Sequence, residues 1–287
     1  MHFGRTANEL GLELSLPDPR RRTLSYLAFA EGLGLPKGRL RCGAPILNCK
    51  EWRGIVYPEE ARPADYLRYY AERYPSIEWN SSFYRLPTLS EVKAFCQKVS
   101  SDFRFCPKAP QQLSHQLARG LDLDVLHAYH QVCEAFGAHY GLGFMQLPDW
   151  FSVSSWDKLC LFTQTWAKRM PLAIELRHPS WFNDHMLLDP VIDLFYRRGI
   201  SPVITDAPGR RDALHMSLTA PQLMVRFLGC FPSRQDDFRV KAWMQRLEGW
   251  SRRGLSEAYF FAHQSKNASI PHTVELALRE QLAIQMG

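Results

Sequence analysis

The sequence predicts an α/β protein with a (β/α)8 TIM-barrel fold, as a single domain behind an irregular N-terminal extension. From residue 39 onward, short apolar runs alternate with segments of helical periodicity. Eight runs of about 5–8 residues match the number and length of strands that such a barrel needs. An open, doubly wound sheet also alternates strands and helices. It usually carries a glycine-rich phosphate turn after an early strand, and this chain has none.

The apolar runs are the predicted strands, and all but one of the connections carry a helical pattern. The strands are predicted at 39–47, 77–84, 103–108, 142–147, 172–178, 202–206, 224–229 and 258–263. The helices are predicted at 63–74, 88–99, 122–136, 154–169, 186–198, 235–253 and 271–284. The exception is 208–222, between the sixth and seventh strands. It is polar and weakly helical, so a short or missing helix is expected there.

Local signals mark the ends of several predicted helices. Thr88 and Glu91 have the spacing of a capping box at the start of the second helix. Gly137 follows the third helix and Gly199 follows the fifth, as C-terminal stop signals. Pro190 falls inside the fifth helix and predicts a kink or a restart there.

Residues 1–38 are the predicted extension, and 39–287 are the predicted barrel domain. The extension is rich in Pro, Gly and Arg with broken periodicity, so we expect partial disorder and a helix near 24–29. The net charge of +6 lies in two segments: 1–41 hold seven Lys/Arg against four Asp/Glu, and 231–254 hold six against three. These segments indicate either contact with nucleic acid or an anionic surface, or a solvated tail and a solvated helix face.

The composition is typical of a cytoplasmic protein. The seven cysteines are widely spread without a C-x-x-C pair, which favours reduced thiols over a disulfide framework or a zinc site. We find no apolar run of about 18 residues, and the N-terminus lacks the apolar core of a signal peptide, so no membrane span is expected. These features leave the oligomeric state open.

Charged side chains cluster at the predicted strand ends, where barrel enzymes place their working groups. In the fifth strand, Glu175 and Arg177 are two residues apart and therefore point the same way. If that direction is the barrel interior, the pair must serve each other or a ligand, because an unpaired buried charge is costly. Other strand ends supply Glu78, Asn80, Tyr84, Lys108, Gln146, Asp206, Arg226 and His263.

Three carboxylates and three cations would then face one cavity, near charge balance. The predicted catalytic residues are Glu175, Asp206 and Glu78, with Glu175 or Asp206 as a general base. The predicted anion- and substrate-binding residues are Arg177, Arg226, Lys108, Asn80, Tyr84, Gln146, His178 and Trp181. The expected ligand is a small anionic or phosphate-containing molecule, and no cofactor is evident.

Each of these side chains also has a structural interpretation. Glu175 and Arg177 would form a static ion pair, His178 would cap a turn, Trp181 would pack, and Asp206 would close an Asx turn. A divalent metal is an alternative for the same strand ends, although the spacing prescribes none. Its ligands would be Glu175, Asp206, His115 and His263.

Five motifs in order resemble the YecE-like family, also called domain of unknown function 72. They are EWNSSFYRLP at 78–87, FRFCPK at 103–108, FMQLP at 144–148, IELRHPSW at 174–181 and VRFLG at 225–229. The resemblance runs from about residue 41 to the C-terminus. It implies a TIM barrel from a mainly bacterial and archaeal family. A suggested relation of that family to endonuclease-IV-like barrels implies a phosphate or nucleic-acid ligand.

The sequence departs from the family pattern on the first strand, at 42–46, and on the last strand, at 260–264. Ser114-His115 stands where the family has Thr-His. Three functional hypotheses follow. The first is an enzyme, a hydrolase or an acid/base catalyst, acting on a small anionic substrate. The second is a nucleic-acid-binding protein or a metal-dependent phosphodiesterase, and the third is a non-catalytic scaffold or sensor.

Overall fold

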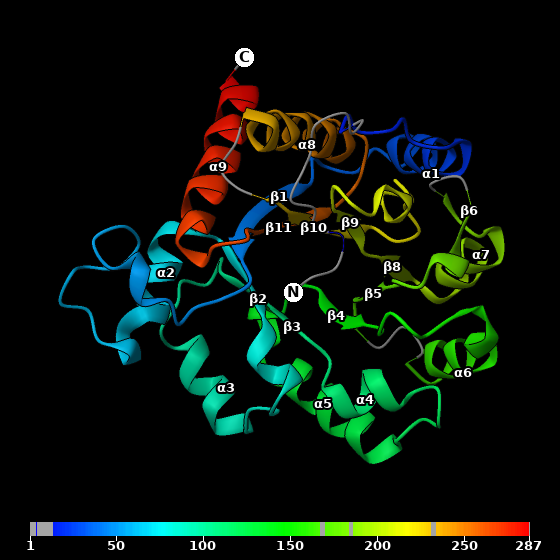
Figure 1. The fold of residues 1–287 in the computed structure, drawn as a ribbon, viewed down its shortest axis with the longest axis horizontal. Helices are drawn as coiled ribbons and strands as arrows, with labels where there is room; N and C mark the ends of the chain where they lie inside the picture. Colours follow the sequence, from blue (N-terminus) through cyan, green and yellow to red (C-terminus); the bar gives the residue numbers. More distant parts are fainter. Residues whose placement is uncertain (1–3, 5–13, 167–169, 184–185, 231–233, 287) are drawn as a thin grey trace.

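The computed structural model describes residues 4, 14–166, 170–183, 186–230 and 234–286 of the chain. Two parallel sheets lie at the centre and helices surround them (Figure 1). The larger sheet has the order β3-β2-β1-β11-β10-β9, and the smaller one has the order β4-β5-β8. The strands of these sheets are β1 Arg39–Ala44, β2 Ser76–Trp79, β3 Arg104–Pro107, β4 Gly143–Gln146, β5 Leu172–Glu175, β8 Ile200–Pro202, β9 Ile204–Asp206, β10 Gln222–Leu228 and β11 Glu257–His263.

The two sheets approach each other at both of their edges. On one side β8 pairs with β5 and β9 pairs with β10, although only Val203 separates β8 from β9 in the chain. Pro202 lacks an amide hydrogen, which interrupts the ladder at this point. On the other side, parallel bridges join Phe105 to Tyr140 and Lys108 to Phe144. The predicted α/β class with parallel strands is confirmed, and a continuous, closed ladder stays a prediction.

An apolar cluster fills the space between the sheets, with members from β3, β4, β5, β10 and β11. Its members are Cys106, Leu142, Phe144, Ala173, Val203, Met224, Tyr259 and Phe261. Side chains two positions further along a strand point the same way. The next layer toward the strand ends therefore includes Gln146, Glu175 and Arg226, so strand alternation stacks a polar layer on an apolar one.

The helices follow the predicted order, with sequence signals at their ends. Thr88 Oγ1 accepts a hydrogen bond from the Glu91 amide at 3.2 Å, and Glu91 Oε2 accepts one from the Thr88 amide at 2.8 Å, which confirms the capping box. Gly199 ends its helix with a φ of 65°, in the left-handed region that glycine adopts without strain. The helices are α1 Arg21–Gly32, α2 Tyr66–Arg73, α3 Leu89–Cys96, α4 Gln111–Gln116, α5 Leu123–Ala135, α6 Trp156–Trp166, α7 Asp189–Arg198, α8 Arg234–Arg252 and α9 Ile270–Met286.

Some boundaries differ from the prediction. The fifth predicted helix, 186–198, begins only at Asp189, because Pro190 occupies the first turn of α7 instead of kinking it. Residues before it form a short antiparallel pair, β6 Phe182–Asn183 with β7 Met186–Leu187. The 208–222 connection holds only a 3-10 turn, Arg211–Ala213, in agreement with the prediction of a short or missing helix there. Helix α4 lies outside the predicted helices.

Part of the N-terminal extension packs on the domain. Helix α1 lies beside α8 and α7 at the edge of the molecule (Figure 1). Its Thr23 hydroxyl donates to the Met216 carbonyl at 3.0 Å and accepts from the Leu218 amide at 3.2 Å, and Leu27 is fully buried. The disorder predicted within 1–38 falls partly on residues outside those described. Within the described residues, we find no helix that is both long and apolar enough to cross a membrane.

Candidate functional site

A buried ion-pair network joins the ends of β2, β5 and β10. Arg226 Nε and Nη2 donate to Glu78 Oε2 and Oε1, each at 3.0 Å. Its Nη1 donates to Glu175 Oε2 at 2.7 Å. All three side chains are fully buried, and both carboxylates accept further hydrogen bonds, which is the condition for a tolerable buried charge cluster.

Glu175 orients a second pair of side chains. Its Oε2 accepts a hydrogen bond from Gln146 Nε2 at 2.6 Å, and Gln146 Oε1 in turn accepts from Lys108 Nζ at 2.9 Å. Its Oε1 accepts from Thr205 Oγ1 at 2.9 Å and from Arg177 Nε at 3.1 Å. The carboxylate therefore fixes the amide of Gln146 and, through it, the position of the Lys108 amine.

Glu78 orients two more side chains. Asn80 Nδ2 donates to Glu78 Oε1 at 2.8 Å and to the Pro45 carbonyl at 2.9 Å, which leaves the Asn80 Oδ1 atom as an acceptor. His263 Nε2 lies 3.0 Å from Glu78 Oε2. Because the ionised carboxylate only accepts, Nε2 carries the hydrogen, and Nδ1 is the free acceptor of the neutral ring.

The network keeps both carboxylates ionised. Burial alone would raise the pKa of Glu175, but Arg177 and Arg226 lower that pKa to about 2. Burial likewise opposes ionisation of Glu78, while Arg226 and His263 hold its pKa well below the ordinary value. Carboxylates with such low pKa values are weak proton acceptors near neutral pH.

A cavity of about 480 Å³ opens over this network at the carboxyl ends of the strands. Its polar lining residues are Asn80, Tyr84, Lys108, His115, Gln146, His263, Gln264 and Asn267. Its apolar lining residues are Pro45, Ile46, Phe83 and Ile270. The described lining holds three nitrogen bases and no carboxylate. It therefore suits an anionic ligand better than a cationic one.

The three nitrogen bases have depressed pKa values. Burial, followed by the charge of Arg226, lowers the pKa of Lys108 to about 8. Burial and the neighbouring Lys108 lower the pKa of His115. Burial also lowers the pKa of His263, against the opposing effect of Glu78. A bound anion would favour the protonated forms of all three.

Six of the predicted site residues line this cavity, whereas Glu78, Glu175 and Arg226 lie beneath it. The six are Lys108, Asn80, Gln146, Tyr84, His115 and His263. Arg177 is outside the lining, and its Nη1 lies 3.7 Å from Asp149 Oδ1. It follows the end of β5, so the predicted strand extends beyond the observed one.

Asp206 belongs to a separate network between β9 and α8. Its Oδ1 accepts from Arg239 at 2.8 Å and from Arg211 at 2.5 Å, and its Oδ2 accepts from Trp243 Nε1 at 2.8 Å. The preceding residue, Thr205, contacts Glu175 instead. Strand alternation therefore sends Asp206 away from the cavity, and the structure does not bring it together with Glu78 and Glu175.

His178 and Trp181 have local structural contacts. His178 Nδ1 accepts from the Ser180 amide at 3.1 Å and caps the short helix that follows. Trp181 is fully buried, and its Nε1 donates to the Phe151 carbonyl at 2.6 Å. Neither lines the cavity at the strand ends. These contacts match the structural interpretation of both residues.

The four residues of the metal alternative are not assembled into one site. The carboxylate oxygens of Glu175 and Asp206 form ion pairs with different arginines, in two separate networks. His263 binds Glu78 and His115 lies on α4. Within the described ranges, no group of three or more His, Cys, Asp or Glu side chains is placed to hold a metal ion. The arrangement of these four side chains does not fit the predicted divalent-metal site.

Five of the six cations of the late basic segment contact acidic side chains of the protein. Arg239 is buried against Asp206 and Asp236. The more exposed pairs are Lys241 with Glu280, Arg246 with Asp18, Arg252 with Glu248 and Arg253 with Glu31. Exposed ion pairs are weak, but these partners reduce the excess positive charge that a nucleic-acid backbone would meet. Contact of the basic segments with nucleic acid stays a prediction.

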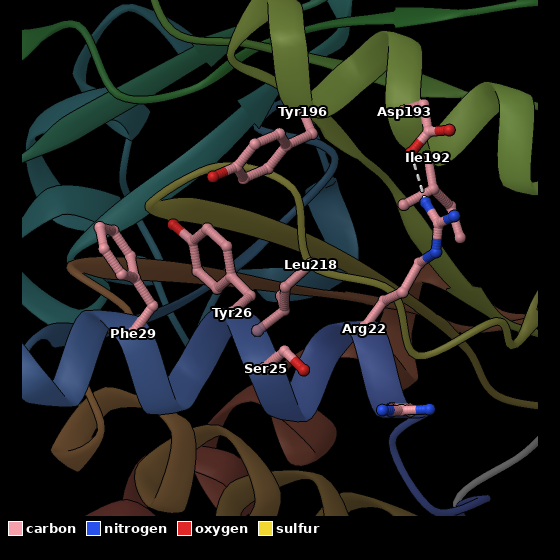
Figure 2. A pocket seen from close by; sticks show the side chains of 9 residues that line it. Arg22, Ser25, Tyr26, Phe29, Ile192, Asp193, Tyr196 and Leu218 are labelled. Atoms are coloured by element: carbon pink, nitrogen blue, oxygen red, sulfur yellow. Dashed lines mark hydrogen bonds and ion pairs between the residues drawn. The ribbon is translucent and has the colours of Figure 1, made fainter.

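Another cavity, of about 620 Å³, lies between α1 and α7 (Figure 2). Tyr26 and Phe29 reach into it from α1, and Tyr196 faces them from α7. Arg22 forms an ion pair with Asp193 across one end. None of the predicted site residues lines this space. The cavity at the strand ends is therefore the better candidate for a functional site.

Several contributors were absent from the sequence prediction. Thr205 donates to Glu175, and Phe83 places its ring 4.2 Å from Lys108 Nζ. Gln264, expected at the end of the last strand but not as a site residue, and Asn267 line the cavity just after β11. The polar run that follows the last strand was a usable signal for the latter two. Thr205 could be found only by knowing which face of its strand points inward.

Comparison with known proteins identifies relatives of the same family. The sequence model described as "Protein of unknown function DUF72" matches residues 41–286. The UPF0759 protein YecE of Escherichia coli (strain K12) is 27% identical over 237 residues, covering 75% of this chain and 86% of that protein. The YecE protein of Escherichia coli O157:H7 has the same identity and coverage.

Solved structures show the same fold. A DUF72 family protein from Enterococcus faecalis V583 has a TM-score of 0.69 at 16% identity, covering 85% of this chain and 96% of that one. A DUF72 family protein from Thermotoga maritima MSB8 has a TM-score of 0.64 at 22% identity, covering 86% and 99% of the two chains. The family match runs from within β1 to the end of α9, so it includes every residue that lines the cavity. The chain therefore belongs to the DUF72 family, as its strand-end motifs indicate.

Proposed function

We propose that this protein binds a small anionic molecule, bearing a phosphate or a carboxylate, in the cavity at the carboxyl ends of the strands. One observation carries the proposal: the described lining presents Lys108, His115 and His263 and no acidic side chain. Glu78 and Glu175 stay beneath the lining, where Arg226 pairs with both carboxylates and Arg177 pairs with Glu175. An entering anion would thus meet donors without meeting a free carboxylate.

The same proposal includes a closed (β/α)8 barrel, because such a barrel gathers the ends of all strands around one cavity. Backbone hydrogen bonds at the sheet junctions support closure. The Ala109 amide donates to the Phe144 carbonyl at 2.7 Å and the Gly141 amide to the Phe105 carbonyl at 2.8 Å. At the other junction, the Val203 amide donates to the Ile174 carbonyl at 2.9 Å. Slow hydrogen exchange at Ala109 and Gly141 is expected, and rapid exchange at both would oppose closure.

Within this site we assign acid/base chemistry to the nitrogen bases rather than to the carboxylates. Lys108 and His263 line the cavity, and the Lys108 pKa of about 8 is nearer neutrality than the Glu175 pKa of about 2. Glu78 and Glu175 act as positioning residues, since they hold Asn80, Gln146 and the two bases in place. This role replaces the general base that the sequence alone assigns to Glu175 or Asp206.

Calorimetric titration with inorganic phosphate tests the proposal. We expect binding by the full chain, and an affinity lower by about 10–100-fold in Lys108→Met, because a charge-assisted hydrogen bond contributes about 1.5–3 kcal/mol. Lys93→Ala is the matched control, since Lys93 is an exposed lysine on α3. Absence of binding in the unmodified protein, or equal affinity in Lys108→Met, would refute the proposed site.

A further inference from the structure

We propose that Lys108 is a nucleophilic amine that condenses with the carbonyl group of a small anionic aldehyde or ketone to form an imine in the strand-end cavity. This inference rests on the proposed anion-binding function and names its substrate class. Three features of Lys108 carry it: its burial, its hydrogen bonding and the cations beside it.

The amine of Lys108 is buried but open to the cavity. The residue is 6% exposed and lines the cavity directly. Its Nζ donates to Gln146 Oε1 at 2.9 Å, and no carboxylate of the described chain lies within ion-pair distance of it. An ammonium has three hydrogens to donate, and Gln146 takes one. The remaining face of the nitrogen is available to a ligand.

The surroundings raise the fraction of Lys108 that is free amine, although the ammonium remains the major form at neutral pH. The ring centroids of Phe83 and Phe144 lie 4.2 Å and 6.0 Å from Nζ. The rings keep water from part of the amine, although a cation–π contact by itself favours the ammonium. Arg226 and Arg177 add positive charge nearby, and burial with Arg226 lowers the pKa of Lys108 to about 8. Compared with an ordinary lysine, this gives on the order of a hundredfold more free amine at neutral pH. Desolvation beside a second cation is a known way of activating a lysine nucleophile.

The carboxylates below the cavity offset only part of the lowering of the Lys108 pKa. Glu78 and Glu175 raise the pKa of Lys108, but the arginines they contact offset part of this effect. Both oxygens of each carboxylate already accept hydrogen bonds from other side chains. Lys108 is thus held by an amide carbonyl instead of an ion pair. A lysine serving only as a structural counter-ion would contact one of these carboxylates.

The proposed step is a condensation that needs no oxidant or reductant. The Nζ lone pair attacks the carbonyl carbon and forms a C–N bond, and the carbonyl electron pair moves to oxygen. Nitrogen releases two protons as the neutral imine forms, and the oxygen takes up two protons, so no net proton is gained or lost. The C–O bond then breaks and water leaves. His263, whose Nδ1 is the acceptor nitrogen, and His115 line the same cavity and are the groups available to transfer these protons.

Reductive trapping tests the inference with the full-length protein. The probe is glyoxylate, a small anionic aldehyde, with sodium cyanoborohydride at neutral pH, and peptide mass mapping measures labelling at each lysine. We expect labelling of Lys108 to exceed that of the exposed Lys93 by at least about tenfold. Sulfate, as a non-reactive anion, should suppress labelling of Lys108 and leave that of Lys93 unchanged. In Lys108→Met, the strong label at position 108 should be absent, while labelling of the other lysines is unchanged.

The outcomes separate the inference from the function beneath it. Equal labelling of Lys108 and Lys93, with phosphate binding intact in the calorimeter, overturns the imine and leaves the anion site standing. Glycolaldehyde is a neutral aldehyde of similar size. If it labels Lys108 selectively while glyoxylate does not, and phosphate fails to bind, the anionic substrate class and the proposed function are both overturned.

Discussion

Glu78 and Arg226 form a fully buried, bidentate ion pair, with two N···O distances of 3.0 Å, between strands β2 and β10. Arg226 also contacts Glu175, so one guanidinium bridges two carboxylates from opposite sheets. The two carboxylates then hold Asn80, Gln146 and His263 directly, and Lys108 through Gln146. The buried charges of Glu78, Glu175 and Arg226 therefore form a frame that supports the residues lining the cavity. Substitutions in this frame can be tested separately from substitutions in the lining.

Glu175→Gln should destabilise the fold. The substitution removes one charge from a buried cluster and leaves Arg226 with a single carboxylate, a change that typically costs about 3–5 kcal/mol. Denaturant unfolding measures it, with Glu60→Gln as a control at an exposed carboxylate. A change in stability within about 0.5 kcal/mol, as at an ordinary surface site, would contradict the role of Glu175 in the frame.

Acid should remove the stabilising effect of Glu175. Its pKa in the folded protein is about 2, below the ordinary value of 4.5. The unfolded chain therefore binds a proton first as the pH falls. The stabilisation is complete above pH 4.5 and is lost as the pH approaches 2, a change of about 3 kcal/mol. Unfolding curves of the native protein and Glu175→Gln should converge over this interval, and a constant separation would disagree with the low pKa.

Asp206→Asn separates folding from ligand binding. Asp206 neutralises Arg239 and Arg211 between β9 and α8 and does not line the cavity. We expect a loss of about 2–4 kcal/mol in unfolding free energy, because Arg211 loses its acidic partner and Arg239 keeps only Asp236 among the described acidic residues. The affinity for inorganic phosphate should stay within about twofold of the original value, because no wall residue moves. A loss of phosphate binding in a folded variant would contradict the placement of Asp206 outside the binding site.

Anion affinity should depend on the protonation of Lys108. Sulfate keeps its charge between pH 6 and 10, so it reports the protein alone. If it binds the ammonium form, its affinity stays constant below the Lys108 pKa of about 8 and falls about tenfold per pH unit above it. The charged and titratable groups around Lys108 are Arg226, Arg177, Glu78, Glu175 and His115. A profile that is flat to pH 10 would contradict binding through Lys108.

The architecture was predictable because its signals are local. Strand and helix order follow from the alternation of apolar runs and helical segments, and the Thr88–Glu91 box and Gly199 act within a few residues of themselves. The start of α7 was misplaced, since Pro190 is equally compatible with a kink and with a first turn. Strand ends were overextended for a similar reason, because a polar residue after a strand does not show where pairing stops.

The site was predictable only in part. Lys108, Gln146, Asn80 and His263 lie where strand ends predict them, around one cavity. The direction of Asp206 was not predictable, because Thr205 and Asp206 are both polar and only the surrounding sheets select the inward face. The sequence also did not show which charged side chains pair with each other, because Arg226 and Glu78 are 148 positions apart in the chain.

A crystal structure of the protein grown with selenate tests the central claim most directly. Selenate is a sulfate analogue whose selenium atom gives an anomalous signal, so its position is found without assumption. The account predicts a peak in the strand-end cavity, with a selenate oxygen at hydrogen-bond distance from Lys108 Nζ. A peak only between α1 and α7, beside Arg21 or Arg22, or no ordered selenate at all at a concentration that saturates sulfate binding, would contradict it.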